Sequence, residues 1–222
     1  MRMLAQLDIA AKKKGLCLRG ALSLQGDPDW GSGTIALLGP DEPRFWEKFS
    51  TSEEFSDGLD NPLDRWSKRV IGQIADEFKG IRAEAVFPSD GPPYPPFLRW
   101  ATESGQAWYS PVGLLVHADA GLLISYRGAL ILRDTLDLPP RGAKPCDACQ
   151  AKPCLAACPV GALVAERDYD VPSCAKYTRS AEGLSCREAG CLVRRACPAS
   201  ERVARPAEQG AFHMSAFLRS RL

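Results

Sequence analysis

Eight of the nine cysteines of this 222-residue chain lie in its last third, and they constrain the fold more than any other feature. The first run is Cys146-x2-Cys149-x4-Cys154-x3-Cys158-Pro159. The second run is Cys174-x11-Cys186-x4-Cys191-x5-Cys197-Pro198, so both runs end in Cys-Pro. Clustered thiols of this kind indicate metal ligation, and a segment of about 80 residues with so little apolar periodicity needs such crosslinks to fold.

The two Cys-Pro endings predict how the ligands are shared between two clusters. In bacterial two-cluster ferredoxins the run is C-x2-C-x2-C-x3-C-P, and its last cysteine binds the other cluster. Applied to this chain, that crossing predicts two 4Fe–4S clusters. The first is bound by Cys146, Cys149, Cys154 and Cys197, and the second by Cys158, Cys174, Cys186 and Cys191. The longer spacings in both runs leave the partition of the ligands open.

Other uses of the cysteines are less favoured by the spacing. A pair of four-cysteine zinc sites is the alternative, because such sites also use C-x2-C pairs. A zinc ribbon supplies two of these pairs per metal, whereas this chain has one in all, which favours iron. Nucleophilic cysteine chemistry is weaker still, since the only histidines are His117 and His213. Cys17, outside the last third, is predicted to be a small core residue.

The charge balance excludes some classes of partner. The chain has 28 basic and 27 acidic residues, which gives no electrostatic case for binding nucleic acid or an anionic membrane. From Arg141 onward there are 13 basic and 8 acidic residues, an excess that would offset the negative charge of thiolate-bound clusters or form a basic surface. Arg194, Arg195, Arg202 and Arg205 could dock an acidic redox partner, although a solvated helix face is the favoured interpretation.

Localisation follows from the apolar segments. The N-terminus has no apolar stretch long enough for a signal peptide. The most apolar region, residues 112–132, is interrupted by His117, Asp119 and Arg127, which argues against a membrane span. We therefore expect a cytoplasmic protein.

Apolar patterns before the cysteines predict alternating strands and helices. Helices are expected at residues 1–14, 62–78 and 97–104, loops around a strand at 15–33, and strands at 34–39, 83–87, 112–117 and 122–132. Asn61 and Pro62 are expected to start the second helix as cap and first-turn proline. Residues 118–121 are expected to join the last two strands as a hairpin. The proline-rich stretch around residues 138–142 predicts a boundary between a domain at 1–140 and a cysteine domain at 141–222.

Two family resemblances rest on these motifs. From Cys146 to Cys158 and on through Ser173-Cys174-Ala-Lys-Tyr177, the chain resembles the iron–sulfur portion of epoxyqueuosine reductases and reductive dehalogenases, which are corrinoid enzymes with two clusters. Its N-terminal part is similar to CblC-type cobalamin-processing proteins at Gly33–Leu38, Asn61–Asp64 and Gly113–His117. The resemblance implies an α+β protein: a nitroreductase-like, cobalamin-processing-like mixed α/β domain followed by a small bacterial-ferredoxin-like two-cluster domain.

The function that this resemblance implies is electron transfer, with the protein acting alone or as the component of an oxidoreductase. The two clusters would pass single electrons to cobalamin bound by the N-terminal domain. The candidate corrinoid-binding residues are Ser110, Gly113, His117 and Arg127. Asp90, in a proline-rich loop, is the candidate proton donor, although a turn residue is its commoner role. A redox partner protein is expected as electron donor or acceptor; the alternative is a ferredoxin-like module without a corrinoid that docks a partner enzyme.

Overall fold

The computed structural model describes residues 2–165 and 167–220, and these form two compact units. The first unit consists of the described residues up to Ala107 together with Ser125–Gly142. The second consists of Trp108–Ile124 and the described residues from Ala143 onward. The chain passes from the first unit to the second for the last time between Gly142 and Ala143, close to the predicted boundary at 140. Residues 108–124 differ from the prediction, because they belong with the cysteine-bearing segment.

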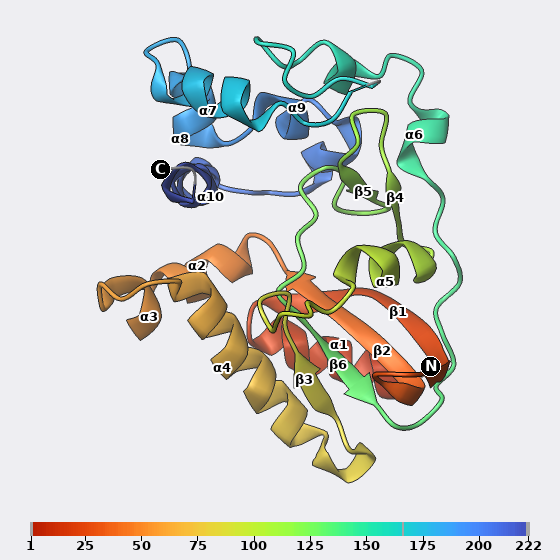
Figure 1. Ribbon diagram of the computed structural model, residues 1–222. Coiled ribbons are helices and arrows are strands. Elements are labelled where there is room, and N and C mark those ends of the chain that lie inside the picture. The colour runs from red at the N-terminus through yellow and green to blue at the C-terminus, as the bar shows by residue number, and fades with distance from the viewer. Residues whose placement is uncertain (1, 166, 221–222) are drawn as a thin grey trace. The chain divides into compact units, whose positions relative to one another are not determined.

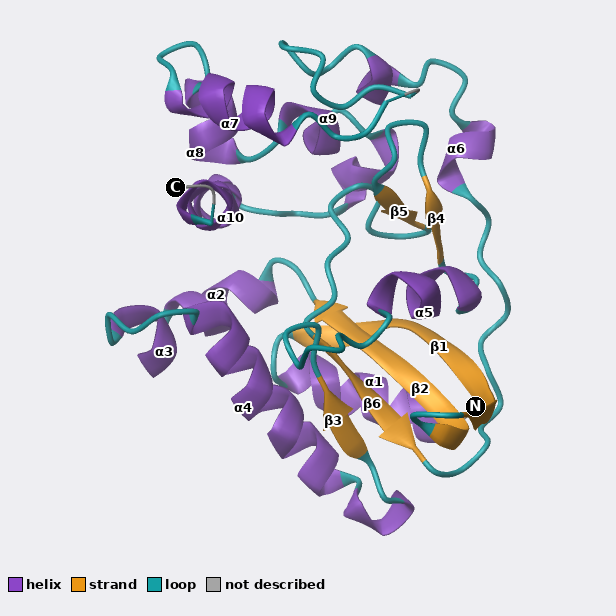
Figure 2. Ribbon diagram, viewed as in Figure 1, coloured by secondary structure: helices purple, strands orange, loops and turns teal. Residues whose placement is uncertain are grey.

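The first unit is built on a four-stranded antiparallel sheet with the order β1-β2-β6-β3 (Figure 1). Its strands are β1 (Leu16–Asp27), β2 (Gly31–Pro40), β3 (Glu84–Val86) and β6 (Gly128–Leu132). Its helices are α1 (Arg2–Lys13), α2 (Arg44–Ser50), α3 (Glu53–Ser56), α4 (Pro62–Glu77), the 3-10 helix η1 (Lys79–Ile81) and α5 (Phe97–Glu103). Figure 2 shows α1 behind the sheet and α5 in front of it.

The two central strands form the core of this unit because they are covered on both faces. Every residue of β6 is buried, and so is β2 from Gly33 to Pro40. A strand buried on both faces has a continuous apolar run instead of an alternating one, which is the pattern of Ile35 to Leu38. Helix α1 packs on β1, and α4 packs on β3 and β6. The unit is a mixed α+β structure.

Several elements of this unit lie where the sequence predicts them. Helix α4 covers the predicted residues 62–78 almost completely, with Asn61 at its N-cap position and Pro62 in its first turn as predicted. Asn61 makes no capping hydrogen bond with its side chain and instead has a left-handed backbone with φ of 52°. The long strand β1 lies where the sequence predicts only loops around a strand, within residues 15–33. Its pairing with β2 is interrupted by irregularities between Leu18 and Gly20 and between Leu24 and Asp27, and its glycines look like loop residues in sequence.

The second unit has little sheet and is mostly short helices. β4 (Ala107–Tyr109) pairs with β5 (Leu115–His117). The helices are α6 (Pro145–Ala148), η2 (Pro153–Leu155), α7 (Val171–Arg179), α8 (Leu184–Ala189), α9 (Leu192–Arg195), η3 (Pro198–Arg202) and α10 (Ala207–Arg219). Across the described parts of both units, no helix is both long and apolar enough to cross a membrane.

The predicted hairpin between residues 112–117 and 122–132 is wrong. His117 and Gly121 close a tight turn by exchanging two backbone hydrogen bonds of 3.0 Å, and the chain beyond it does not pair with β5. Leu122 is held by the cysteine-bearing segment instead: its N–H donates to Ser200 Oγ at 3.0 Å, and its carbonyl accepts from Arg194 Nη1 at 2.5 Å. The sheet strand starts later, at Gly128.

Candidate metal centre

Four cysteines line one cavity in the second unit. They are Cys158, Cys174, Cys186 and Cys191, and we call them the second cysteine set. Leu163, Val193 and Met214 complete the apolar part of the wall. The cavity holds about 340 Å³ of empty space, its open mouth included. These are the four cysteines that the Cys-Pro crossing assigns to the second cluster, with Cys158 contributed by the first run.

Short helices position the second cysteine set. Cys174 lies on α7, whose N-terminus is capped by Asp170 accepting from the Ser173 N–H at 3.0 Å. Cys186 lies on α8, and Cys191 immediately precedes α9. Gly190 makes the tight connection between them with φ of 90°. That conformation favours glycine, so the turn needs this residue to bring the two thiols to one wall.

The sulfur atoms of this set accept hydrogen bonds. The Ala162 N–H donates to Cys158 Sγ at 3.2 Å, and the Tyr169 hydroxyl donates to Cys174 Sγ at 3.0 Å. Burial raises the pKa of Cys191, and the nearby backbone N–H groups of Arg194 and Val193 oppose that rise. Such donors stabilise a negatively charged sulfur, which a metal-bound thiolate carries and a free thiol does not.

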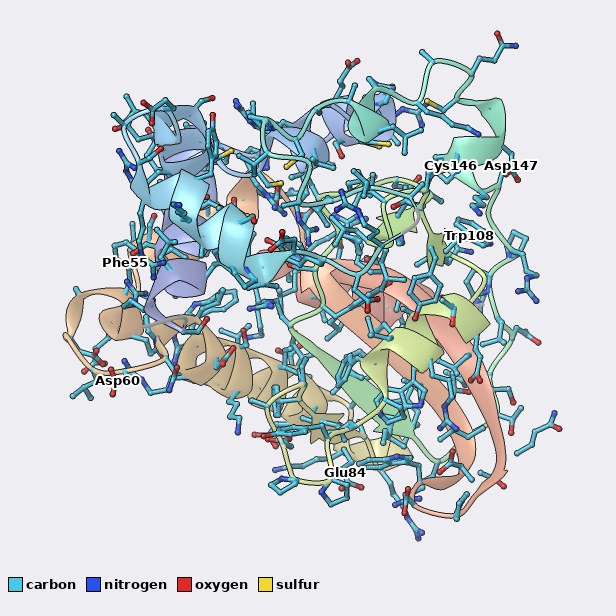
Figure 3. The ribbon with its side chains drawn as sticks, turned by 45° about the horizontal axis from the view of Figure 1, so that its top comes forward. Phe55, Asp60, Glu84, Trp108, Cys146 and Asp147 are labelled. Carbon is cyan, nitrogen blue, oxygen red and sulfur yellow. The ribbon has the colours of Figure 1, made fainter. Side chains whose placement is uncertain are left out.

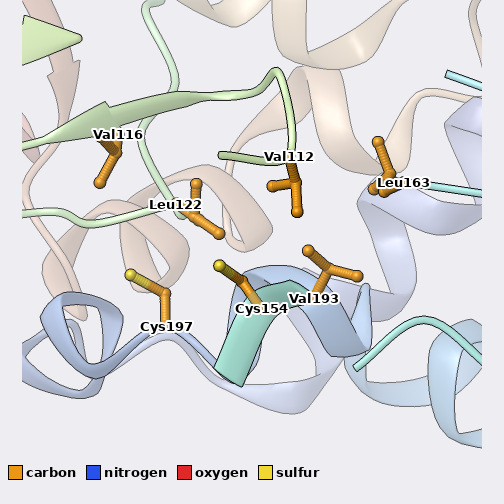
Figure 4. Close-up of a cluster of buried hydrophobic side chains, with 7 residues drawn as sticks. All are labelled: Val112, Val116, Leu122, Cys154, Leu163, Val193 and Cys197. Atoms are coloured by element: carbon orange, nitrogen blue, oxygen red, sulfur yellow. The ribbon is translucent and has the colours of Figure 1, made fainter. Parts of the chain in front are cut away.

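The remaining four cysteines, Cys146, Cys149, Cys154 and Cys197, form the first cysteine set. Cys154 on η2 and Cys197 just before η3 are buried against Val112, Val116, Leu122 and Val193. Figure 4 shows the sulfur atoms of Cys154 and Cys197 directed toward the side of Val116 and Leu122. Cys146 on α6 packs against the same hydrophobic cluster, as does Trp108; both are labelled in Figure 3. Cys149 follows α6 and is half-buried.

The electrostatics of the thiols follow the same division. Burial raises the pKa of Cys154, and the neighbouring Cys197, Cys146 and Cys149 raise it further. Burial also raises the pKa of Cys174, where Cys191 and Cys158 are the cysteine neighbours. Free thiols in such surroundings stay protonated and are poor nucleophiles, whereas a coordinating metal removes the proton.

The residues that line the cavity can be compared with the ligands of an iron–sulfur cluster. Among the described residues, no three His, Cys, Asp or Glu side chains converge as a site for a single metal ion. The second set instead surrounds a cavity, and its sulfur atoms already face hydrogen-bond donors. Four thiolates spread around a cavity are the ligand chemistry of an iron–sulfur cubane. Ligation of iron by either set stays a prediction.

The ninth cysteine has a structural role. Cys17 is buried in β1, and its Sγ donates to the Pro40 carbonyl at 3.4 Å. Burial raises its pKa to about 11. This agrees with the predicted role as a small core residue.

The candidate corrinoid residues fall in different units. Ser110, Gly113 and His117 lie in the second unit, and Arg127 lies in the first. Ser110 and Gly113 close a turn, in which the Gly113 N–H donates to the Ser110 carbonyl at 3.0 Å. His117 is buried, and its Nδ1 accepts from the N–H groups of Asp119 at 3.0 Å and Ala120 at 3.3 Å. Nδ1 therefore stabilises the turn and is not available as a metal ligand.

Arg127 and Asp90 make local contacts within the first unit. Arg127 Nε donates to the Tyr126 carbonyl at 3.1 Å, and its Nη1 lies 3.9 Å from Asp64 Oδ1. One carboxylate oxygen of Asp90 accepts from the Phe87 N–H at 3.0 Å, and the other pairs with Lys68 Nζ at 2.8 Å. Asp90 is thus a turn residue in this structure.

The sequence does not predict the roles of two side chains near the second cysteine set, Tyr169 and Arg194. Tyr169 carries no motif that marks it as a partner of Cys174. Arg194 was assigned to a solvated basic stripe, but it is half-buried and donates to the Leu122 carbonyl. Arg205 of the same stripe donates to the Leu123 carbonyl at 2.7 Å. The prediction of a solvated helix face is wrong for Arg194 and Arg205. A sequence pattern does not show which arginines donate to a loop that is distant in the chain.

Comparison with known proteins shows a shared fold. No family model and no curated protein matches the chain. Among solved structures, that of epoxyqueuosine reductase from Streptococcus thermophilus is similar, with a TM-score of 0.52, 14% sequence identity, and coverage of 93% of this chain and 68% of that chain. This supports the predicted relation to epoxyqueuosine reductases at the level of the fold, while similarity to CblC-type proteins stays a prediction. The chain is a mixed α+β protein with small antiparallel sheets, similar in fold to epoxyqueuosine reductase.

Proposed function

We propose that this chain is an iron–sulfur redox protein that binds two 4Fe–4S clusters, one in each cysteine set. The observation that carries the proposal is the cavity walled by Cys158, Cys174, Cys186 and Cys191. Cysteines from both sequence runs contribute to it, which is the ligand sharing typical of paired clusters. When bound, such clusters accept and donate single electrons.

The residues around each cysteine set would stabilise a bound 4Fe–4S cluster. In the second set, the backbone N–H of Ala162 and the hydroxyl of Tyr169 stabilise thiolate charge. In the first set, Val112, Val116 and Leu122 exclude water from Cys154 and Cys197. An excess of basic residues in this part of the chain offsets the negative charge of thiolates and sulfide.

A matched pair of ligand variants tests the proposal. Cys154 and Cys158 are four residues apart in one run but belong to different sets. We expect Cys154→Ser and Cys158→Ser each to lose about four of about eight iron atoms per chain, since each removes a ligand from a different cluster. Electron paramagnetic resonance of the reduced proteins should show that Cys154→Ser loses the same signal as Cys197→Ser, and Cys158→Ser the same signal as Cys174→Ser. If Cys154→Ser and Cys158→Ser lose the same signal, the assignment is wrong.

The finer proposal is that the electrons reach a corrinoid such as cobalamin, with Ser110, Gly113, His117 and Arg127 among the binding residues. The similarity in fold to epoxyqueuosine reductase supports it. Within the described residues, the buried Ser110 Oγ has no hydrogen-bond partner, so this hydroxyl is free to bind a polar group. The Nδ1 contacts of His117 argue against ligation of cobalt by that nitrogen.

Titration with cob(II)alamin under anaerobic conditions tests the corrinoid proposal separately from the clusters. A saturable spectral change, weakened in Ser110→Ala, would support it. If cobalamin does not bind the iron-loaded protein, the alternative function is favoured: a ferredoxin-like module that passes electrons to a docked partner enzyme. Either outcome leaves the cluster assignment to be judged on its own measurements.

A further inference from the structure

The two cysteine sets differ in the polar groups that reach them. The charged residues next to Cys146 of the first set are one cation, Lys144, and one carboxylate, Asp147. In the second set, the hydroxyl of Tyr169 donates to Cys174, and Arg194 lies on α9, whose N-cap residue is Cys191. These two side chains are the basis of a difference between the clusters.

Tyr169 is held in place on both sides. Its hydroxyl donates to Cys174 Sγ at 3.0 Å, and its ring stacks on Phe217 of α10 with centroids 6.4 Å apart and planes at 18°. A phenol has an ordinary pKa of about 10, so its hydroxyl is a hydrogen-bond donor at neutral pH. Because the stacking involves the ring and not the hydroxyl, replacing tyrosine by phenylalanine removes the hydrogen bond and keeps the stacking.

Arg194 brings a poorly solvated positive charge to the same set. Its guanidinium donates to the Leu122 carbonyl, and burial lowers its pKa. Cys191 is a favourable electrostatic neighbour, whereas Arg205 is an unfavourable one. Among the described residues, no ion pair joins Arg194 to a carboxylate, and Cys191 is its most favourable electrostatic neighbour.

We propose that Tyr169 and Arg194 raise the reduction potential of the cluster bound by Cys158, Cys174, Cys186 and Cys191 above that of the other cluster. Adding an electron makes a thiolate-bound cluster more negative, and a hydrogen-bond donor and a nearby cation stabilise the more negative state. The electron supplied by a low-potential one-electron donor therefore rests on the second cluster at equilibrium. Both side chains act through cysteine ligands and are positioning residues. This inference rests on the proposed function.

An anaerobic redox titration monitored by electron paramagnetic resonance tests the inference with two pairs of variants. Tyr169→Phe removes the hydroxyl and keeps the stacked ring. Its control is Tyr177→Phe, because Tyr177 lines the same cavity but donates to the Glu182 carbonyl at 2.8 Å. Arg194→Gln removes the charge. Its control is Arg195→Gln, because the neighbouring arginine is exposed and donates to Ser185 Oγ at 2.9 Å.

We expect the higher of the two one-electron steps to shift to lower potential in Tyr169→Phe and Arg194→Gln. A tenfold change in the ratio of oxidised to reduced cluster corresponds to about 59 mV for one electron, and this is the size of shift expected for each variant. Both controls should leave both steps in place, and Arg194→Lys should recover most of the shift because it keeps the charge.

Iron and sulfide content of the unmodified protein separates the two ways of failing. If it contains no iron and sulfide, the proposed function fails. If it is fully loaded and the upper step stays unchanged in Tyr169→Phe and in Arg194→Gln, or if both steps move equally, the inference is wrong while the proposed function stands. Should one variant fail to hold its clusters, the other decides.

Discussion

Replacing Ser200 by alanine should loosen the packing of the first cysteine set. The Ser200 hydroxyl accepts the Leu122 N–H at 3.0 Å, and both residues are buried, at 3% and 1% exposure. Ser200→Ala leaves that N–H without an acceptor and with little access to water. A buried unsatisfied donor costs about 1–3 kcal/mol. Because Leu122 packs against Cys154 and Cys197, the loss should be felt at those ligands.

Amide hydrogen exchange of the iron-loaded protein measures this effect locally. A cost of about 1–3 kcal/mol corresponds to roughly 5-fold to 160-fold faster exchange at Leu122. Denaturant unfolding should show a lower free energy of unfolding for the second unit. Ser185→Ala is the control, since Ser185 is exposed and its change should stay within about 0.5 kcal/mol. Exchange at Leu122 as slow in Ser200→Ala as in the control would refute the reasoning.

Three further changes test other parts of the structure. Arg69 Nε and Nη2 donate to the two carboxylate oxygens of Glu54 at 2.5 Å and 2.9 Å, and this pairing lowers the pKa of Glu54 to about 2. The pair should therefore stabilise the protein above the ordinary pKa of 4.5 and lose this effect as pH falls toward 2. Glu54→Gln should flatten that part of the pH profile of the urea midpoint. In Gly210→Ala, the new Cβ would lie 2.5 Å from the carbonyl oxygen of Ala189, the last residue of α8. We expect thermal unfolding to show a loss of stability of about 1–3 kcal/mol. The second set should also hold less iron, because α8 carries Cys186. Cys17→Ala should retain the full iron content by metal analysis, and iron loss there would contradict its structural role.

The sequence predicted much of the first unit because its elements carry strong local signals. Helix α4 has apolar residues at helical spacing, and β2 has a continuous apolar run bounded by glycine. The sequence predicts loops around a strand at residues 15–33 but not the full length of β1, because glycines and two pairing irregularities interrupt its pattern. The hairpin prediction failed for a different reason. The segment after Gly121 takes its hydrogen bonds from Ser200 and Arg194, some 70 to 80 residues away, and no local pattern shows such contacts.

The candidate site divides in the same way. The cysteine runs mark the ligands because their spacing is a local property, and the crossing rule then groups residues far apart in the chain. The surroundings of the ligands could not be predicted, since they depend on tertiary packing. The ring of Tyr169 stacks on Phe217, far along the chain, and this contact helps to place its hydroxyl at Cys174. Arg194 is not fully solvated because its guanidinium donates to the carbonyl of Leu122.

Metal and sulfide analysis of the anaerobically purified or reconstituted protein tests the central claim most directly. Two crossed cysteine sets filled with cubanes require about eight iron atoms and about eight acid-labile sulfides per chain. About two zinc atoms per chain with no sulfide would contradict the account, because the same thiols would then be closed zinc sites with no redox chemistry.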